Sequence, residues 1–104
     1  MTPFAAKTYR LLKTVPRGRV TTYKALANKL GTRAYRAIGQ LMRNNPYAPS
    51  VPCHRVVAAD GTIGGYMGSR SGGDIEKKIV LLESEGVRVI GHRIANFPKI
   101  LYTF

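Results

Sequence analysis

Acidic side chains are scarce in this sequence: its 104 residues include 5 Asp and Glu against 17 Lys and Arg, a formal net charge of +12 at pH 7. Residues 1–59 carry eleven basic side chains and no acidic one. Solubility needs only mixed charge, so an acid-free stretch of this length favours a polyanionic partner over a merely solvated basic surface. Nucleic acid fits better than an anionic membrane, because every basic helix needs its apolar face for the core.

The chain also has a single cysteine, no tryptophan and no long apolar run. One cysteine excludes an internal disulfide and a multi-cysteine zinc site, and it fits a reducing, intracellular setting. No run approaches the ~18 apolar residues that span a bilayer, and the N-terminus does not read as a signal peptide. We therefore expect one domain covering residues 1–104, located in the cytoplasm, or in the nucleus of a eukaryote.

Hydrophobic spacing predicts three helices in the first 45 residues. Thr2 caps the first, and the second runs from its cap at Thr22 to a left-handed stop at Gly31. Between them lie a turn at residues 16–19 and at most a stub of strand. The third helix begins at once with Thr32 as its cap and ends at residues 44–46. The residues expected to face inward are Phe4, Thr8, Leu11, Leu12 and Val15, then Tyr23, Leu26, Ala27 and Leu30, then Ala34, Ala37, Ile38, Leu41 and Met42.

The second and third helices, joined by a tight glycine turn, have the form of a helix-turn-helix. Four donors of the third are spaced by three and four residues and share one outer face: Arg33, Arg36, Gln40 and Arg43. A recognition helix presents such a stripe to phosphates and bases, although an ordinary solvated face has the same pattern. The acid-free surroundings favour the recognition helix.

Proline and glycine organise the second half of the chain. Prolines at positions 46, 49 and 52 stiffen the loop that leads to Cys53. Asp60-Gly61 between apolar segments predicts a hairpin that would serve as a wing, and residues 64–73 hold five glycines. A fourth helix, capped by Asp74, ends at Gly86 and buries Ile75, Ile79 and Leu82. The expected fold class is mainly α with a small β-hairpin, a winged helix-turn-helix-like domain with a core at about 4–86 and an unassigned tail at 87–104.

The densest chemistry in the chain is Pro-Cys-His-Arg-Val at 52–56. A thiolate is a strong nucleophile, neighbouring Arg and His supply a positive field, and a base can take the thiol proton directly or through one water. A carboxylate can orient that base, and both Glu83 and Glu85 qualify, since each sits where the helix dipole disfavours it. Alone, Cys53 would be a small buried hydrophobe and His54 a structural histidine. Together, after a stiff loop in a basic domain, they indicate a nucleophilic site.

Five motifs occur in order: TTYKALA, RAIGQLMRNNP, PCHRV, GTIGGY and LLESEG. With them the sequence resembles the active-site domain of the O6-alkylguanine-DNA alkyltransferases, from about Phe4 to Gly86. That family inserts a helix-turn-helix into the minor groove, flips out the damaged guanine and transfers its O6-alkyl group to a cysteine. The resulting thioether is not hydrolysed, so the resemblance implies one turnover per molecule and no cofactor or metal.

The resemblance also assigns residues by position. Cys53 is implied to be the alkyl acceptor, with His54 as its water-mediated base and Glu85 as the carboxylate partner. Asn45 matches the asparagine that braces the active-site turn. Tyr23 matches the tyrosine that contacts the 3′ phosphate and donates a proton toward the leaving guanine.

The remaining positions concern DNA and the substrate pocket. Arg36 matches the arginine that fills the gap left by the flipped base, and Ala37 is small enough for the helix to approach a groove closely. Arg33, Gln40 and Arg43 complete the expected DNA-binding set. The expected pocket comprises Arg55, Val56, Tyr66, Met67 and Gly68, with the backbone of Cys53 and Val56 reading the guanine amino edge. Met67 stands where the family usually has a small Ser, and the larger Met side chain is expected to narrow the pocket. The stretch 68–77 is longer than is usual in the family.

The implied partner is double-stranded DNA containing O6-alkylguanine. We expect a monomer to bind it, and this monomer could be fused to another repair domain or act beside one. The family's common N-terminal domain is not represented in these residues. Two other hypotheses stay open. One is a lesion-binding module without transfer, like the alkyltransferase-like proteins, which replace the reactive cysteine. The other is a winged helix-turn-helix regulator that reads an operator and has an incidental cysteine.

Overall fold

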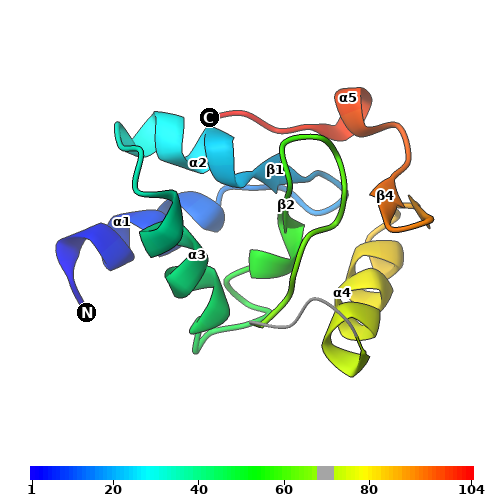
Figure 1. Cartoon of the computed structure of the whole chain (residues 1–104), viewed down its shortest axis with the longest axis horizontal. Coiled ribbons are helices and arrows are strands. Elements are labelled where there is room, and N and C mark those ends of the chain that lie inside the picture. The colour runs from blue at the N-terminus through cyan, green and yellow to red at the C-terminus, as the bar shows by residue number, and fades with distance from the viewer. Residues whose placement is uncertain (68–71) are drawn as a thin grey trace.

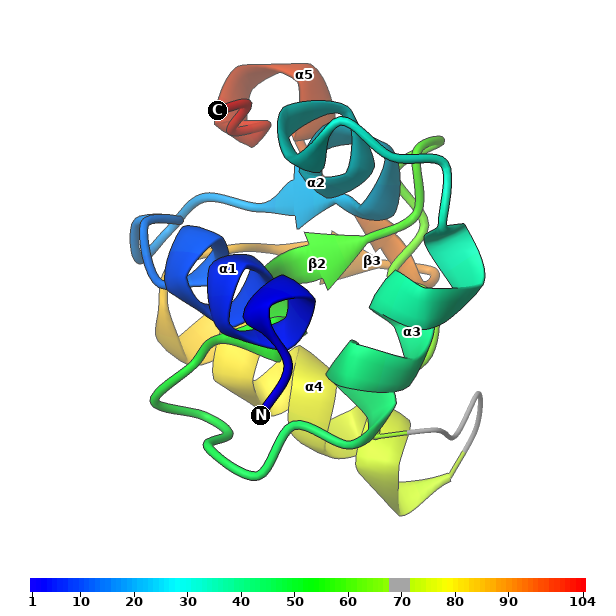
Figure 2. The same ribbon diagram turned by 90° about the vertical axis from the view of Figure 1, so that its left-hand side faces the viewer.

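The computed structural model describes residues 1–67 and 72–104, and it is mainly helical around a short pair of strands (Figure 1). In Figure 2, β1 and β2 lie between α2 and α4, and α1 and α3 stand on either side. The elements are α1 (Pro3–Leu12), β1 (Thr21–Thr22), α2 (Tyr23–Leu30), α3 (Tyr35–Arg43), the 3₁₀ helix η1 (Cys53–Arg55), β2 (Val56–Val57), α4 (Gly73–Ser84), β3 (Val89–Ile90), β4 (Arg93–Ile94) and α5 (Phe97–Ile100). In this part of the chain, no helix is long and apolar enough to cross a membrane. The expected fold class is confirmed.

The first two helices are capped as their sequence predicts. Oγ1 of Thr2 accepts the N–H of Ala5 at 3.1 Å, and Oγ1 of Thr22 accepts the N–H of Ala25 at 3.0 Å. Gly31 ends α2 with φ 69, the left-handed conformation that glycine adopts without strain. Helices α2 and α3 pack on each other, which confirms the predicted helix-turn-helix arrangement.

The start of α3 differs from the prediction. Oγ1 of Thr32 accepts the N–H of Ala34 at 3.0 Å, so Thr32 closes a local turn and the helix begins only at Tyr35. Ala34 therefore precedes the helix and is exposed. Ala37 is exposed too, because it lies about 100° around the helix from the buried Ile38. Arg33 also precedes α3 and does not belong to the stripe of Arg36, Gln40 and Arg43.

The hairpin predicted around Asp60-Gly61 is wrong in its pairing. The turn forms, with the N–H of Ala58 donating to the carbonyl of Thr62 at 2.9 Å. Strand β2, however, pairs in parallel with β1, and Thr62 bridges to Arg93. Val56 and Val57 are fully buried, which suits a strand covered on both faces better than an exposed wing. The antiparallel hairpin lies instead in the tail, where β3 and β4 flank Gly91 and His92 at φ 55 and φ 60.

Helix α4 has no side-chain cap, so the prediction that Asp74 caps it is wrong. Its N-cap is Gly72, and Asp74 lies in the first turn, where a negative charge suits the helix dipole. Gly86 ends the helix as predicted, at φ 86. The tail then returns to β1: the N–H of Val20 donates to Ile100, and the N–H of Tyr102 donates to Val20. The segment left unassigned from the sequence is thus part of the folded domain.

Candidate functional site

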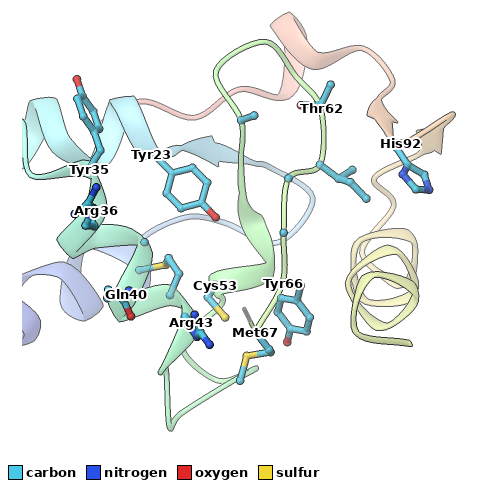
Figure 3. A pocket seen from close by; sticks show the side chains of 16 residues that line it. Tyr23, Tyr35, Arg36, Gln40, Arg43, Cys53, Thr62, Tyr66, Met67 and His92 are labelled. Carbon is cyan, nitrogen blue, oxygen red and sulfur yellow. The ribbon is translucent and has the colours of Figure 1, made fainter. Parts of the chain in front are cut away.

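A pocket of about 880 Å³ opens between α3 and residues 58–67. Figure 3 shows Cys53 at its floor, with the α3 side chains on one side and Tyr66 and Met67 on the other. The Cys53 residue is only 4% exposed, yet it lines this pocket directly. The thiol therefore opens to the pocket beside α3 and is not sealed in the core.

The loop before Cys53 is held by Asn45, which is almost fully buried. Nδ2 of Asn45 donates to the carbonyl of Val51 at 2.8 Å, and its Oδ1 accepts the N–H of Tyr47 at 3.0 Å. Both ends of the proline-rich loop are thus tied to one side chain. The chain then turns into η1, whose first residue is Cys53. The sequence had not indicated this 3₁₀ turn.

The thiol environment is less ionising than the sequence suggested. Burial raises the pKa of Cys53 above its ordinary value, and the opposing influences do not reverse this. Those influences are hydrogen bonding with Asn45, the charge of Lys78, and hydrogen bonding with the backbone and Tyr66. The positive field expected from Arg55 and His54 therefore does not by itself produce a thiolate.

Behind the cysteine, His54 and Arg55 both reach Glu85. Nε2 of His54 lies 3.1 Å from Oε2 of Glu85. Nε and Nη2 of Arg55 donate to the two carboxylate oxygens at 2.9 and 2.6 Å, and Nη1 donates to the carbonyl of Val15 at 2.8 Å. Of the two acids that the sequence left open, Glu85 is beside His54, and Glu83 is exposed. The guanidinium of Arg55 bonds within this network and does not line the pocket, so the prediction that Arg55 is a pocket residue is wrong.

The geometry also fixes the proton on His54. Burial lowers the pKa of the ring despite its bond to Glu85, so the imidazole is neutral near neutral pH. Burial alone would raise the pKa of Glu85, but hydrogen bonds from Arg55 and His54 hold it below its ordinary value. An ionised carboxylate only accepts, so the hydrogen of the neutral ring is on Nε2. Nδ1 is then a lone-pair acceptor, buried and without a hydrogen-bond partner among the described residues.

Lys78 is the main site residue that the sequence analysis missed. It is fully buried, and its Nζ donates to the carbonyls of Val56, Ile63 and Gly65. Burial lowers its pKa to about 8, while the nearby Cys53 opposes that shift. The available signal was its position three residues after Ile75 and four before Leu82, on the inward face of α4.

The opposite wall of the pocket is held by the tail. The N–H of Ile63 donates to the carbonyl of His92 at 2.9 Å, and the N–H of Ile94 donates to Gly61 at 2.8 Å. A Cβ on Gly61 would meet the Phe97 ring at 2.9 Å, so only glycine permits this contact. Residues 61–65 are thus fixed between β3–β4, α5 and the amine of Lys78.

The predicted residues fall into several groups around this pocket. Tyr23, Arg36, Gln40, Arg43, Tyr66 and Met67 line it, as do Tyr35, Met42, Thr62 and His92, which had not been predicted. Met67 has φ 50, a strained conformation for a non-glycine residue. Val56 is fully buried in β2, so only its backbone can serve the pocket. Gly68 lies outside the described residues.

Fold and site together define a helix-turn-helix domain with a buried cysteine, Cys53, at the floor of a pocket beside α3. A family model, 6-O-methylguanine DNA methyltransferase, DNA binding domain, matches residues 3–87, and the chain belongs to this family. In the described part of the chain, no group of three or more His, Cys, Asp or Glu could hold a metal ion.

Three known proteins illustrate the relationship. The methylated-DNA–protein-cysteine methyltransferase of Thermococcus kodakarensis is 52% identical over 89 residues, which cover 85% of this chain and 47% of that protein. M. tuberculosis OGT, solved in complex with DNA, is 40% identical with a TM-score of 0.71, covering 82% of this chain and 50% of that one. S. pombe Atl1, solved with damaged DNA containing O6-carboxymethylguanine, is 29% identical with a TM-score of 0.84, covering 100% and 98%. The chain thus spans about half the length of the curated relatives it matches.

Proposed function

We propose that this chain repairs DNA by transferring an O6-alkyl group irreversibly from an everted guanine to Cys53. The observation that carries the proposal is the Cys53 thiol at the floor of a pocket lined by the recognition helix. A cavity of about 880 Å³ is ample for a purine and its adduct. The names of the relatives at 52% and 42% identity support the same reaction.

The chemistry is an in-line displacement at the alkyl carbon. The sulfur forms a bond to carbon as the carbon–O6 bond breaks, and the electron pair of that bond passes to the guanine. The thiol proton goes to Nδ1 of His54 through one water, and guanine takes up a proton from Tyr23. His54 then releases its proton to solvent and Tyr23 regains one from solvent, so the net change is transfer of the thiol proton to guanine. The thioether product leaves no bond that water can cleave readily, so the protein is consumed.

The neighbouring groups suit these proton transfers. Nδ1 of His54 offers its lone pair because Nε2 faces the carboxylate of Glu85 at 3.1 Å. An imidazolium formed during the reaction would be stabilised by that carboxylate. Tyr23 lines the same pocket from the start of α2, where a hydroxyl can meet the departing base.

In this proposal, α3 is the element that contacts duplex DNA. Everting a base costs roughly a few kcal/mol, and an inserted side chain helps to hold the gap open. Arg36 is exposed on α3 and lines the pocket, which supports the proposal that its guanidinium fills the gap left by the everted base. We further expect the protein to act as a monomer on double-stranded DNA in the cytoplasm or nucleus.

The test is intact mass after incubation with an O6-methylguanine duplex under reducing conditions. The expected result is a gain of one methyl group in place of one hydrogen on Cys53, and no gain in Cys53→Ser with DNA affinity nearly intact. An unmodified wild-type protein that still binds DNA would refute the transfer.

A second function, lesion binding without transfer, has one observation in its favour. Atl1 covers all of this chain, tail included, whereas the methyltransferase family model stops at residue 87. The presence of Cys53 favours transfer, because alkyltransferase-like proteins replace that residue. Tight binding of alkylated DNA with no change of mass would establish the second function.

A further inference from the structure

A second groove, of about 500 Å³, runs between the outer face of α2 and the end of the tail. Lys24, Asn28 and Lys29 line it from α2, and Ala59, Thr103 and Phe104 line its other sides. No part of the reaction described above uses it. The groove is lined by two exposed ammonium groups, several hydrogen-bond donors and some apolar side chains.

The helix is divided cleanly between the core and this groove. One face of α2 lines the groove with Lys24, Ala25, Asn28 and Lys29, which are spaced as neighbours on a helix. The core is contacted by the other face, which includes the buried Leu26 and Ala27. None of the described residues that line the groove is acidic. The nearest acid in sequence is Asp60, whose carboxylate accepts the N–H and hydroxyl of Thr62 at 3.0 and 2.7 Å. Among the described side chains that line the groove, the charged groups are therefore the ammonium groups of Lys24 and Lys29.

The groove adjoins the main pocket along the sequence, although none of the described residues lines both. Tyr23 lines the pocket, and its neighbours Thr22 and Lys24 line the groove. Ala58 and Ala59 divide in the same way. Figures 1 and 2 show the C-terminus beside α2 at the upper edge of the molecule. Two segments, the start of α2 and residues 58–59, thus link the pocket to the groove.

The far wall of the groove is preformed. Nε and Nη2 of Arg19 donate to the carbonyls of Ile100 and Leu101 at 3.0 and 2.8 Å, and the guanidinium lies 5.6 Å from the centre of the Tyr102 ring. Tyr102 in turn packs edge-on against Phe104. A preorganised wall loses little entropy when a ligand binds.

We propose that this groove binds the phosphodiester backbone of the DNA strand beyond the everted nucleotide. Lys24 and Lys29 neutralise phosphates, and Asn28 and the Thr103 hydroxyl donate hydrogen bonds to the backbone. The inference rests on the proposed function, which it extends from the lesion to the flanking strand. It also gives the tail a role in DNA binding.

The test compares Lys24→Ala/Lys29→Ala with Lys7→Ala/Lys13→Ala, which removes the same charge from exposed positions in α1 and at its C-cap. Affinity for a lesion-bearing duplex is measured across salt concentrations, and transfer from free O6-methylguanine base is measured in parallel. Loss of two phosphate contacts makes the log–log salt slope shallower by about 1.8, so the affinity deficit narrows about twelvefold between ~50 and ~200 mM salt. The α1 control keeps the wild-type slope, and all three proteins react equally with the free base.

Each other outcome is decisive. If the groove variant and the α1 control change the salt slope equally, the groove does not bind DNA and the proposal is overturned. Later discovery of an acidic protein segment in the groove would not restore it. If the groove variant also loses transfer from the free base, its defect lies in the pocket, and the proposal again fails. Absence of DNA binding and transfer in the wild-type protein would instead remove the proposed function itself.

Discussion

The carboxylate of Glu85 offers a sharp test of the site, because replacing Glu85 by Gln removes one charge and little volume. Glu85 accepts from Nε2 of His54 at 3.1 Å and from Nε and Nη2 of Arg55 at 2.9 and 2.6 Å. An amide has a single accepting oxygen, so at least one of these donors loses its acceptor. The guanidinium of Arg55, 15% exposed, also loses its counter-charge.

The size of the effect follows from burial. Breaking a fully buried ion pair costs about 3–5 kcal/mol, whereas an exposed pair contributes about 0–1 kcal/mol. The Glu85 side chain is 9% exposed, so the pair lies nearer the buried limit, and we expect a loss of about 2–3 kcal/mol. For a domain of this size, that lowers Tm by roughly 10–20 °C. Glu83→Gln is the matched control: Glu83 is exposed at the same helix end, and its change should stay within about 0.5 kcal/mol.

The sign of the pH dependence is also fixed. The pKa of Glu85 is lower in the folded protein than its ordinary 4.5, so the unfolded chain binds the proton first as pH falls. The stability that Glu85 contributes is present above pH 4.5 and is lost as pH drops through the folded pKa. In urea unfolding, the free energy of unfolding of the wild type should fall by this contribution between neutral and acidic pH. Glu85→Gln should lack the contribution at both pH values. Equal stabilities of the Glu83 and Glu85 variants at neutral pH would refute the reasoning.

Three further predictions concern the rest of the site. Lys78→Met leaves three backbone carbonyls without their donor and should cost about 2–4 kcal/mol in urea unfolding at neutral pH. Because burial lowers the pKa of Lys78 to about 8, the folded protein binds fewer protons than the unfolded chain between pH 8 and 10.5, so the gap between wild type and this variant should widen over that range. Arg36→Ala should slow repair of duplex DNA more than of single strands, and equal losses in mass-detected transfer would remove its gap-filling role. Met67→Ser should raise the transfer rate for bulky O6 adducts relative to methyl, which a competition assay between the two substrates measures.

The local parts of this fold could be read from the sequence, and the long-range pairings could not. A cap such as Thr22 bonds a backbone group three residues away, so a short pattern contains the whole interaction. The partner of Val56 is Thr21, and nothing near Val56 in the sequence indicates that pairing. Asp60-Gly61 carries a true turn signal, but the strands that it was expected to join bond elsewhere.

The site divides in the same way. The motif around Cys53 predicted a candidate nucleophile, and the structure places that residue in the pocket. Spacing could not choose between Glu83 and Glu85, since both stand at the end of one helix. The choice depends on where η1 places His54, which is a tertiary fact. The periodicity of α4 puts Lys78 on the apolar face, but a charged side chain is ordinarily assigned to solvent. Three carbonyls from separate segments make its burial possible, and only the fold brings them together.

The buried sulfur fits a protein that can react once, because a permanently ionised thiol would be lost to any small electrophile. Burial raises the pKa of Cys53, so the free protein should hold a thiol that ionises only when a base acts on it. Iodoacetamide should therefore modify folded protein more slowly than urea-unfolded protein at the same pH, and one cysteine per chain makes the mass count unambiguous. Cys53→Ser, which should take up no label, sets the background. Equal labelling rates in the two states would mean that the fold neither raises the pKa of the sulfur nor shields it, and that selectivity for the lesion must come from DNA binding alone.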